Sequence, residues 1–197
     1  MKKFILIFIL YIPLVLYAQE NAPNKAAICA ACHGQQGNSA NPEWPNIAGQ
    51  HPKYFIKQLK EMRDSSLYNA PIMSTIVATL SKQDIDELAA YYARMPIAYS
   101  STPEQFLKHG EQLYREGDFA KRITACIACH GPKGSGNAQA GFPVLAGQHA
   151  VYTVLQLNAF KDGKRKNDLN HIMRDISSRM SQDDMKAVAH YIEGLGN

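Results

Sequence analysis

Apolar side chains recur along the chain at helical spacing. Between residues 81 and 92, four of them fall at positions i, i+3, i+4 and i+7, on one face of a helix: Ile85, Leu88, Ala89 and Tyr92. The same spacing returns 100 residues later: Met185, Val188, Ala189 and Ile192. The ranges 54–62 and 152–160 are expected to form two further helices. No run of alternating β-branched residues is long enough for a sheet, so the pattern predicts an all-α fold.

Start and stop signals mark the ends of several helices. Ser81 and Ser181 are each followed three positions later by an Asp, a variant of the capping box that opens a helix. Thr102, with Pro103 in the first turn behind it, is expected to cap another helix. Gly194 is expected to cap the end of the last helix.

The chain repeats itself. WPNIAGQHPKYFIKQL at 44–59 matches FPVLAGQHAVYTVLQL at 142–157, with eight of the 16 positions identical. A stretch rich in Pro and Ser interrupts the helical pattern between the copies, and we place a linker at 98–103. The repeat therefore predicts two tandem domains, at 19–97 and at 104–197, each with a full set of the same parts.

The first residues predict export. Lys2 and Lys3 precede an apolar run at 4–18, which is the pattern of a secretory signal peptide at 1–18. The run is shorter than the about 20 apolar residues of a membrane span. Cleavage would leave the body of the protein in the periplasm. A retained segment would tether it to the membrane, which allows a peripheral membrane association.

The charge of the chain argues against one class of partner. The formal charge is +4, and loss of Lys2 and Lys3 leaves 19 basic residues against 17 acidic ones, a charge of +2. So mild an excess does not support binding to nucleic acid.

Two cysteine pairs carry the candidate chemistry, in Cys-x-x-Cys-His motifs at 29–33 and 126–130. A thioredoxin-like dithiol needs a preceding strand, and a disulfide framework is typical of shorter chains richer in cysteine. A shared zinc site would leave both histidines unexplained. Attachment of two covalently bound haem c groups explains every residue, with His33 and His130 as iron ligands. The thiols that would attach the haems are Cys29, Cys32, Cys126 and Cys129.

The repeat also selects candidates for the second iron ligand. Met73 and Met173 occupy matching places, each after an Ile and eight residues before the Ser that opens the last helix of its copy. A thioether is a common axial ligand of haem iron, so we expect His33 to pair with Met73 and His130 with Met173. Met180, which also lies in a suitable loop, is the alternative to Met173.

Other histidines are weaker candidates. His51 and His149 match across the two AGQH strings and could be sixth ligands of a bis-His haem. Their position just before a helix favours a cap or a bond to nearby backbone. His171 has no counterpart in the first copy and is expected to be a surface residue.

These motifs resemble class I c-type cytochromes, and in particular the dihaem cytochrome c4 family. The resemblance covers nearly all of the chain after the signal and rests on CAACHG, CIACHG, the two PxxAGQH strings, and the tripeptides IMS and IMR. It implies two tandem class I cytochrome c domains related by a pseudo-twofold axis. It also implies that Pro45 and Pro143 supply the backbone carbonyls that orient His33 and His130.

Two segments bear on packing and charge. In the second domain, Gly110 would let the first helix cross the last helix closely, whereas the first domain lacks this Gly and its first helix is expected to pack less tightly. The basic run KDGKRKND at 161–168 is expected to be a solvated loop. The alternatives are that it faces haem propionates or an acidic partner.

The resemblance implies a periplasmic electron carrier and not an enzyme. Its redox partners would be a quinol-oxidising membrane complex as donor and a terminal oxidase as acceptor. An alternative is the dihaem electron-accepting subunit of a flavoenzyme of the sulfide dehydrogenase type. A dihaem peroxidase is less favoured, because Met73 and Met173 leave neither iron with an open position.

Overall fold

The computed structural model describes residues 22–64, 67–68 and 70–196, and the expected signal peptide at 1–18 lies outside them. Over this part of the chain the protein is helical, with isolated bridges and no strand, so the all-α prediction is confirmed. The helices are α1 (Ala26–His33), α2 (Pro52–Asp64), α3 (Pro71–Val77), α4 (Lys82–Ala93), α5 (Glu104–Arg115), α6 (Ile127–His130), α7 (Ala150–Lys161), η1 (Leu169–His171), α8 (Ile172–Ser178) and α9 (Gln182–Gly194). None of these helices is long and apolar enough to span a membrane.

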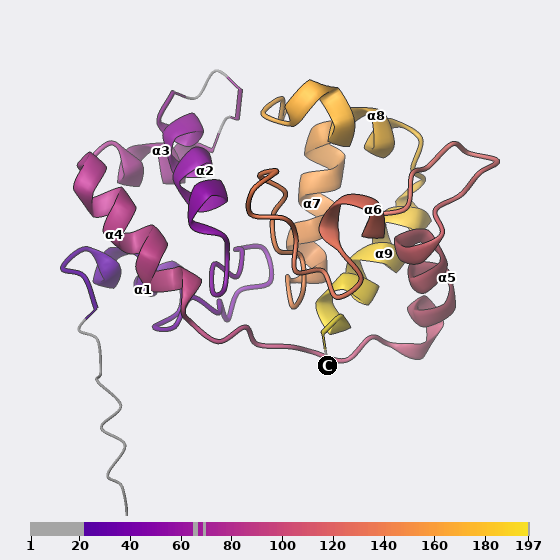
Figure 1. Ribbon diagram of the computed structural model, residues 1–197, viewed down its shortest axis with the longest axis horizontal. Helices are drawn as coiled ribbons and strands as arrows, with labels where there is room; N and C mark the ends of the chain where they lie inside the picture. The colour runs from indigo at the N-terminus through magenta and orange to yellow at the C-terminus, as the bar shows by residue number, and fades with distance from the viewer. Residues whose placement is uncertain (1–21, 65–66, 69, 197) are drawn as a thin grey trace, which may run out of the picture.

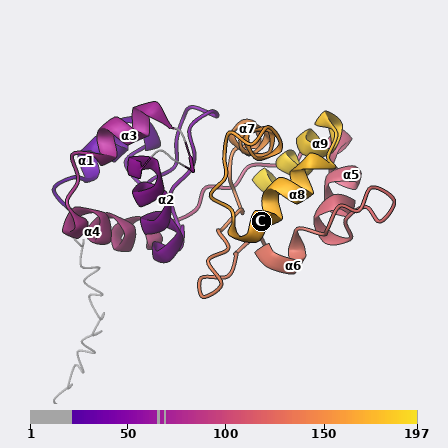
Figure 2. The same cartoon turned by 90° about the horizontal axis from the view of Figure 1, so that it is seen from above.

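The helices form two bundles that lie side by side (Figures 1 and 2). Helices α1 to α4 build the first, and α5 to α9 the second, with one extended connection from α4 to α5 along one side of the molecule (Figure 1). Each bundle has its own apolar core: Leu88 and Tyr92 are fully buried in the first, and Leu113 and Val188 in the second. Each copy of the sequence repeat thus folds around its own apolar core.

The predicted capping boxes both form. The backbone N–H of Ser81 donates to Asp84 Oδ2 at 2.8 Å, and the backbone N–H of Asp84 donates to Ser81 Oγ at 3.1 Å. Ser181 and Asp184 make the same pair of bonds at 2.9 and 3.1 Å. Each box satisfies two groups at the helix N-terminus that would otherwise lack a partner.

The predicted roles of Thr102 and Gly194 were wrong. Helix α5 has Pro103 as its N-cap and no side-chain cap, while the Thr102 hydroxyl donates to His190 O at 3.2 Å. Helix α9 ends at Gly194, but its C-cap is Leu195. A Cβ at Gly194 would lie 2.3 Å from Thr102 Oγ1. Thr102 and Gly194 are therefore both part of the contact between the linker and α9. This contact joins segments far apart in the chain, so local sequence signals do not predict it.

The first helices of the two domains differ. In the second domain α5 crosses α9 so closely that a Cβ at Gly110 would lie 2.3 Å from Ala187 O. Tyr114, one turn further on, is fully buried. In the first domain α1 carries the cysteine motif itself and buries only Ala26 and His33. The looser packing expected from the missing Gly agrees with this arrangement.

A buried carboxylate locks α9 to the rest of the second domain. Asp184 is 1% exposed, and its Oδ1 accepts from Lys121 Nζ and from His109 Nε2, each at 2.9 Å. Burial alone would raise the pKa of Asp184, but the bonds from Lys121, Ser181 and His109 outweigh it and hold the pKa well below its ordinary value. The equivalent Asp84 is half-buried, and among the described residues its carboxylate bonds only to the capping Ser81.

Asp184→Asn should lower the free energy of unfolding of the second domain by about 1–3 kcal/mol at neutral pH, because Lys121 loses a charged, buried acceptor. The matched change Asp84→Asn should cost less, about 0.5–1 kcal/mol, since only an exposed cap weakens. Urea unfolding at pH 7 measures both. Equal losses in the two variants would contradict the special role of Asp184.

The same variants give a pH dependence. Because folding depresses the pKa of Asp184, its contribution to stability is complete above the ordinary value of 3.8 and is lost as the pH falls towards the folded-state pKa. The stability gap between the wild type and Asp184→Asn should therefore shrink below about pH 4. A gap that stays constant down to the acid-unfolding range would show that the carboxylate charge does not contribute.

Candidate functional site

Each Cys-x-x-Cys-His motif lies on a short helix that ends at its histidine. The first motif is in α1, and the second is in α6 with Cys126 as N-cap. The next residue is Gly34 or Gly131, with φ of 79° and 75° in the left-handed region that favours glycine. A Cβ at Gly34 would lie 2.2 Å from Asn38 O, so the backbone turns here only without a side chain. The turn leaves both histidines 7% exposed.

A proline carbonyl fixes each histidine ring. His33 Nδ1 lies 2.8 Å from Pro45 O, and His130 Nδ1 lies 3.0 Å from Pro143 O. Because a carbonyl oxygen can only accept, Nδ1 carries the proton and donates, and Nε2 keeps its lone pair. Burial lowers the pKa of both imidazoles, although the carbonyl bonds partly oppose this. Each ring is therefore neutral and held still, with Nε2 available to a metal.

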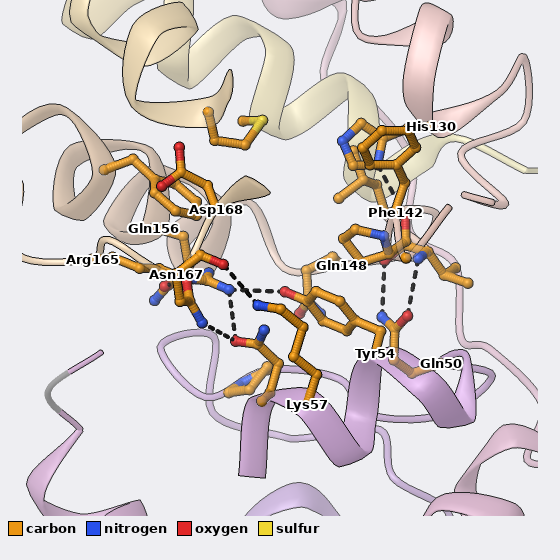
Figure 3. A pocket seen from close by; sticks show the side chains of 18 of the residues that line it. Gln50, Tyr54, Lys57, His130, Phe142, Gln148, Gln156, Arg165, Asn167 and Asp168 are labelled. Atoms are coloured by element: carbon orange, nitrogen blue, oxygen red, sulfur yellow. Dashed lines mark hydrogen bonds between the residues drawn. The ribbon is translucent and has the colours of Figure 1, made fainter. Parts of the chain in front are cut away.

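One cavity of about 890 Å³ is lined by residues of both domains. Its wall includes nine of the predicted site residues: Cys29, His33, Pro45, Met73, Cys126, Cys129, His130, Pro143 and Met173. Cys32 is half-buried and lies outside this wall. Met62 and Met180 also line the cavity, so position on the wall does not by itself select the thioether ligands. Figure 3 shows the part of the cavity beside His130 and the domain boundary.

The cysteines fit attachment of a cofactor better than the competing chemistries. All four thiols are free. Burial raises the pKa of the Cys29 thiol, and that of Cys126 to about 12, whereas a redox dithiol needs a lowered pKa. In the described part of the chain, no three His, Cys, Asp or Glu side chains gather as a metal-ion site would require, so the two cysteine pairs do not form one zinc cluster.

Two glutamines join the domains reciprocally. Gln50 Oε1 accepts from Val144 N at 3.0 Å, and Gln50 Nε2 donates to Val144 O at 3.1 Å. Gln148 binds the backbone of Asn46 in the same way, at 2.9 and 2.8 Å. Gln50 and Gln148 are the glutamines of the two AGQH strings (Figure 3). The two copies of the AGQH string thus make equivalent contacts across the domain boundary, related by a pseudo-twofold axis.

The histidines that follow these glutamines also bind across the boundary. His51 Nε2 lies 2.8 Å from Ser135 O, and His149 Nε2 lies 2.9 Å from Ser39 O. Both rings bond to backbone, as expected, but to backbone of the opposite domain, and His149 is the N-cap of α7 although its side chain makes no cap bond. Helices α2 and α7 begin at the interface, so the side chain that precedes each helix reaches the opposite domain. His171 is exposed, as expected.

Comparisons with known proteins identify the family. The profile of the cytochrome c family matches residues 24–95 and 107–196. A cytochrome c4 of Azotobacter vinelandii is 41% identical over 180 residues, which cover 87% of this chain and 86% of the relative. The chain belongs to the cytochrome c4 family. The crystal structure of reduced recombinant cytochrome c4 from Pseudomonas stutzeri matches with a TM-score of 0.82 and 40% identity, over 87% of this chain and 95% of that one.

A further relative has a more specific description. A thiosulfate dehydrogenase electron acceptor of Stutzerimonas stutzeri is 40% identical over 185 residues, which cover 92% of this chain and 85% of the relative.

The cytochrome c4 family membership confirms the predicted fold of two cytochrome c domains. It also makes the protein a dihaem electron carrier, with two covalently bound haem c groups, and not an enzyme.

The site fits this cofactor on its own geometry. Two neutral imidazoles, each with a free Nε2, line the same cavity as three of the cysteine thiols and the methionine sulfurs. Thioether-forming thiols, an imidazole and a Met sulfur are the donor set of c-type haem.

The basic run at 161–168 is solvated only in part, because its lysines are exposed but Arg165 and Asn167 are buried. Arg165 is 5% exposed and Asn167 is 7% exposed, and both lie at the boundary between the two domains. The run contacts the first domain through its backbone. The backbone N–H of Lys166 donates to Leu67 O at 2.7 Å, and Arg165 forms an isolated antiparallel bridge with Tyr68. The positive charge of the run predicted exposure to solvent. Arg165 and Asn167 are buried because the two domains pack against each other here.

Gln148→Leu should weaken the docking of the domains, because it leaves the backbone N–H and carbonyl of Asn46 without their partner. We expect a loss of about 1–3 kcal/mol and a separation of the two unfolding transitions in calorimetry. Gln112→Leu, at an exposed position of α5, is the control and should leave the transitions unchanged. If both variants unfold like the wild type, the reciprocal glutamine bonds do not stabilise the interface.

Proposed function

We propose that this dihaem electron carrier works in the periplasm, where it accepts electrons from a quinol-oxidising membrane complex and passes them to a terminal oxidase. The observation that carries the proposal is the pair of neutral, buried histidines, each held by a proline carbonyl on the wall of one cavity. The signal pattern at 1–18 supports the location. The membrane complex and the oxidase follow from the family resemblance.

The ligands are proposed from the repeat and the cavity together. His33 would bind one iron with Met73, which lies in the first turn of α3, and His130 would bind the other with Met173 in the first turn of α8. Both methionines are on the cavity wall and at matching places in the fold. Met180 shares the wall, but its counterpart in the first domain is Leu80. The attaching thiols are Cys29, Cys32, Cys126 and Cys129.

A bound haem c supplies a one-electron Fe(III)/Fe(II) couple. The chain holds the ligand set constant, because the bonds from His33 to Pro45 and from His130 to Pro143 fix both rings in either state. Met sulfur favours the ferrous state, and a buried apolar wall disfavours the additional charge of the ferric state. Both effects raise the reduction potential, as the acceptor of a quinol-oxidising complex requires. That residues of both proposed sites line one cavity supports electron transfer between them.

A second candidate role is supported by the relative described as a thiosulfate dehydrogenase electron acceptor. In that role the chain would take electrons from a sulfur-oxidising dehydrogenase, the same class of role as the flavoenzyme subunit expected as an alternative. Reduction of the oxidised holoprotein by each purified donor separates the two. Fast reduction by quinol and the membrane complex supports the primary proposal. Fast reduction only by thiosulfate and its dehydrogenase, with co-purification of that enzyme, would contradict the primary proposal and support the second role.

Met73→Ala should remove the Met–iron charge-transfer band of one haem, and Met173→Ala that of the other. The potential of the affected haem should fall, because the thioether that favours the ferrous state is gone. Optical spectra recorded during a potentiometric titration measure both effects.

Met62→Leu and Met180→Leu are the matched controls, since both methionines line the same cavity without being the proposed ligands. Both bands should persist in each control. Loss of a band in Met180→Leu, with none in Met173→Ala, would transfer the ligand assignment to Met180.

A further inference from the structure

Arg165 is a buried cation at the boundary between the two domains (Figure 3). The residue is 5% exposed, and its guanidinium carbon lies 4.6 Å from the ring centroid of Tyr68 and 4.5 Å from that of Phe160. Tyr68 belongs to the first domain and Phe160 to the second. Aromatic faces attract a cation, but they do not neutralise it.

Neutral oxygens take four of the N–H donors of Arg165. The acceptors are Asn167 Oδ1 at 2.9 Å, Gln156 Oε1 at 2.9 Å, Tyr54 Oη at 2.8 Å and Gln58 Oε1 at 2.8 Å. A guanidinium has five N–H donors. One donor, on Nη1, therefore has no hydrogen-bond acceptor among residues 22–64, 67–68 and 70–196.

The nearby carboxylates already have their own cations. Glu61 accepts from Lys57 Nζ at 2.8 Å, and Asp168 pairs with Arg174 at 2.7 Å. No carboxylate of the described residues forms an ion pair with Arg165. A buried charge without a counter-ion is unfavourable unless a bound group supplies the opposite charge.

The uncompensated guanidinium lies on the wall of the haem cavity, as do all four of its acceptors. We propose that Arg165 is a carboxylate-binding site that takes a haem propionate in the holoprotein, an inference that rests on the haem sites of the proposed function. A planar guanidinium with a free donor suits a carboxylate, and its charge needs one. Gln58, Gln156 and Tyr54 hold the guanidinium in place and make the site depend on docked domains.

The site is not duplicated, although its surroundings are. Tyr54 and Gln58 correspond in the repeat to Tyr152 and Gln156, and all four line the cavity. The stretch of the first domain that corresponds to 162–168 is 64–70, and it contains no Lys or Arg. Among the described residues, Arg165 is thus the one buried Lys or Arg at a pseudo-symmetric interface, which makes the environments of the two haems unequal.

The test compares the holoproteins of the wild type, Arg165→Gln and Arg165→Lys with a matched control, Lys164→Gln. The Lys164 side chain is 77% exposed and is absent from the cavity wall, so its loss changes the net charge equally without touching the site. Both midpoint potentials are measured by potentiometric titration, in chloride and in phosphate buffer. Haem content and the Met–iron bands are recorded on the same samples.

We expect Arg165→Gln to shift at least one midpoint potential downwards, because a positive charge beside the cofactor disfavours the ferric state. Lys164→Gln should leave both potentials in place, and Arg165→Lys should retain most of the wild-type value. Unchanged potentials in Arg165→Gln, with two haems and both bands present, would overturn the site. A wild-type potential that depends on the buffer anion, and loses this dependence in Arg165→Gln, would mean a solvent anion in place of a propionate.

A crystal structure of the wild-type holoprotein keeps the proposal testable if Arg165→Gln does not accumulate with both haems. A propionate oxygen within about 3.2 Å of Arg165 Nη1 supports the site, and water or an inorganic anion there overturns it. Failure of the proposed function would show differently, as missing haem or missing Met–iron bands in the wild type.

Discussion

The bond between each motif histidine and a proline carbonyl is the constraint on which the site depends. It fixes which ring nitrogen carries the proton, and so which nitrogen faces the cavity. The bond needs a helix that ends at the histidine and a backbone that turns at once, which the glycine after each motif permits. Because carbonyl and ring come from different segments, the packing of each domain holds the proposed metal ligand in its orientation.

The interface reuses the same part of the chain. The string that begins with the orienting proline continues into AGQH, and its glutamine and histidine bind the backbone of the opposite domain. Each segment therefore orients the motif histidine of its own domain and binds the backbone of the other domain. A loosened interface would affect the proline carbonyls, because each proline lies five residues before its glutamine, Gln50 or Gln148. This shared segment explains why one cavity joins two domains that have separate cores.

The two halves are similar in design and unequal in detail. The second domain has the close crossing of α5 and α9 at Gly110 and the fully buried Asp184, whereas the matching Asp84 is only half-buried. It also supplies Arg165, the one buried Lys or Arg in the part of the interface that the structure describes. Identical donor sets in unequal environments can have different reduction potentials, because burial and nearby charge act on each iron separately.

The sequence by itself determined the helices and the duplication, and it predicts the donor set of the proposed haem sites. Capping boxes at Ser81 and Ser181, the motif histidines and the matched prolines are local signals, because each involves residues a few positions apart or repeated at constant offset. Tertiary structure decided what depends on contacts between distant segments. His51 binds Ser135, Thr102 binds His190, and Arg165 is buried between residues of both domains. Charge and propensity describe a residue in water, whereas its neighbours across an interface decide whether it is buried, so the chain pattern could not predict these three.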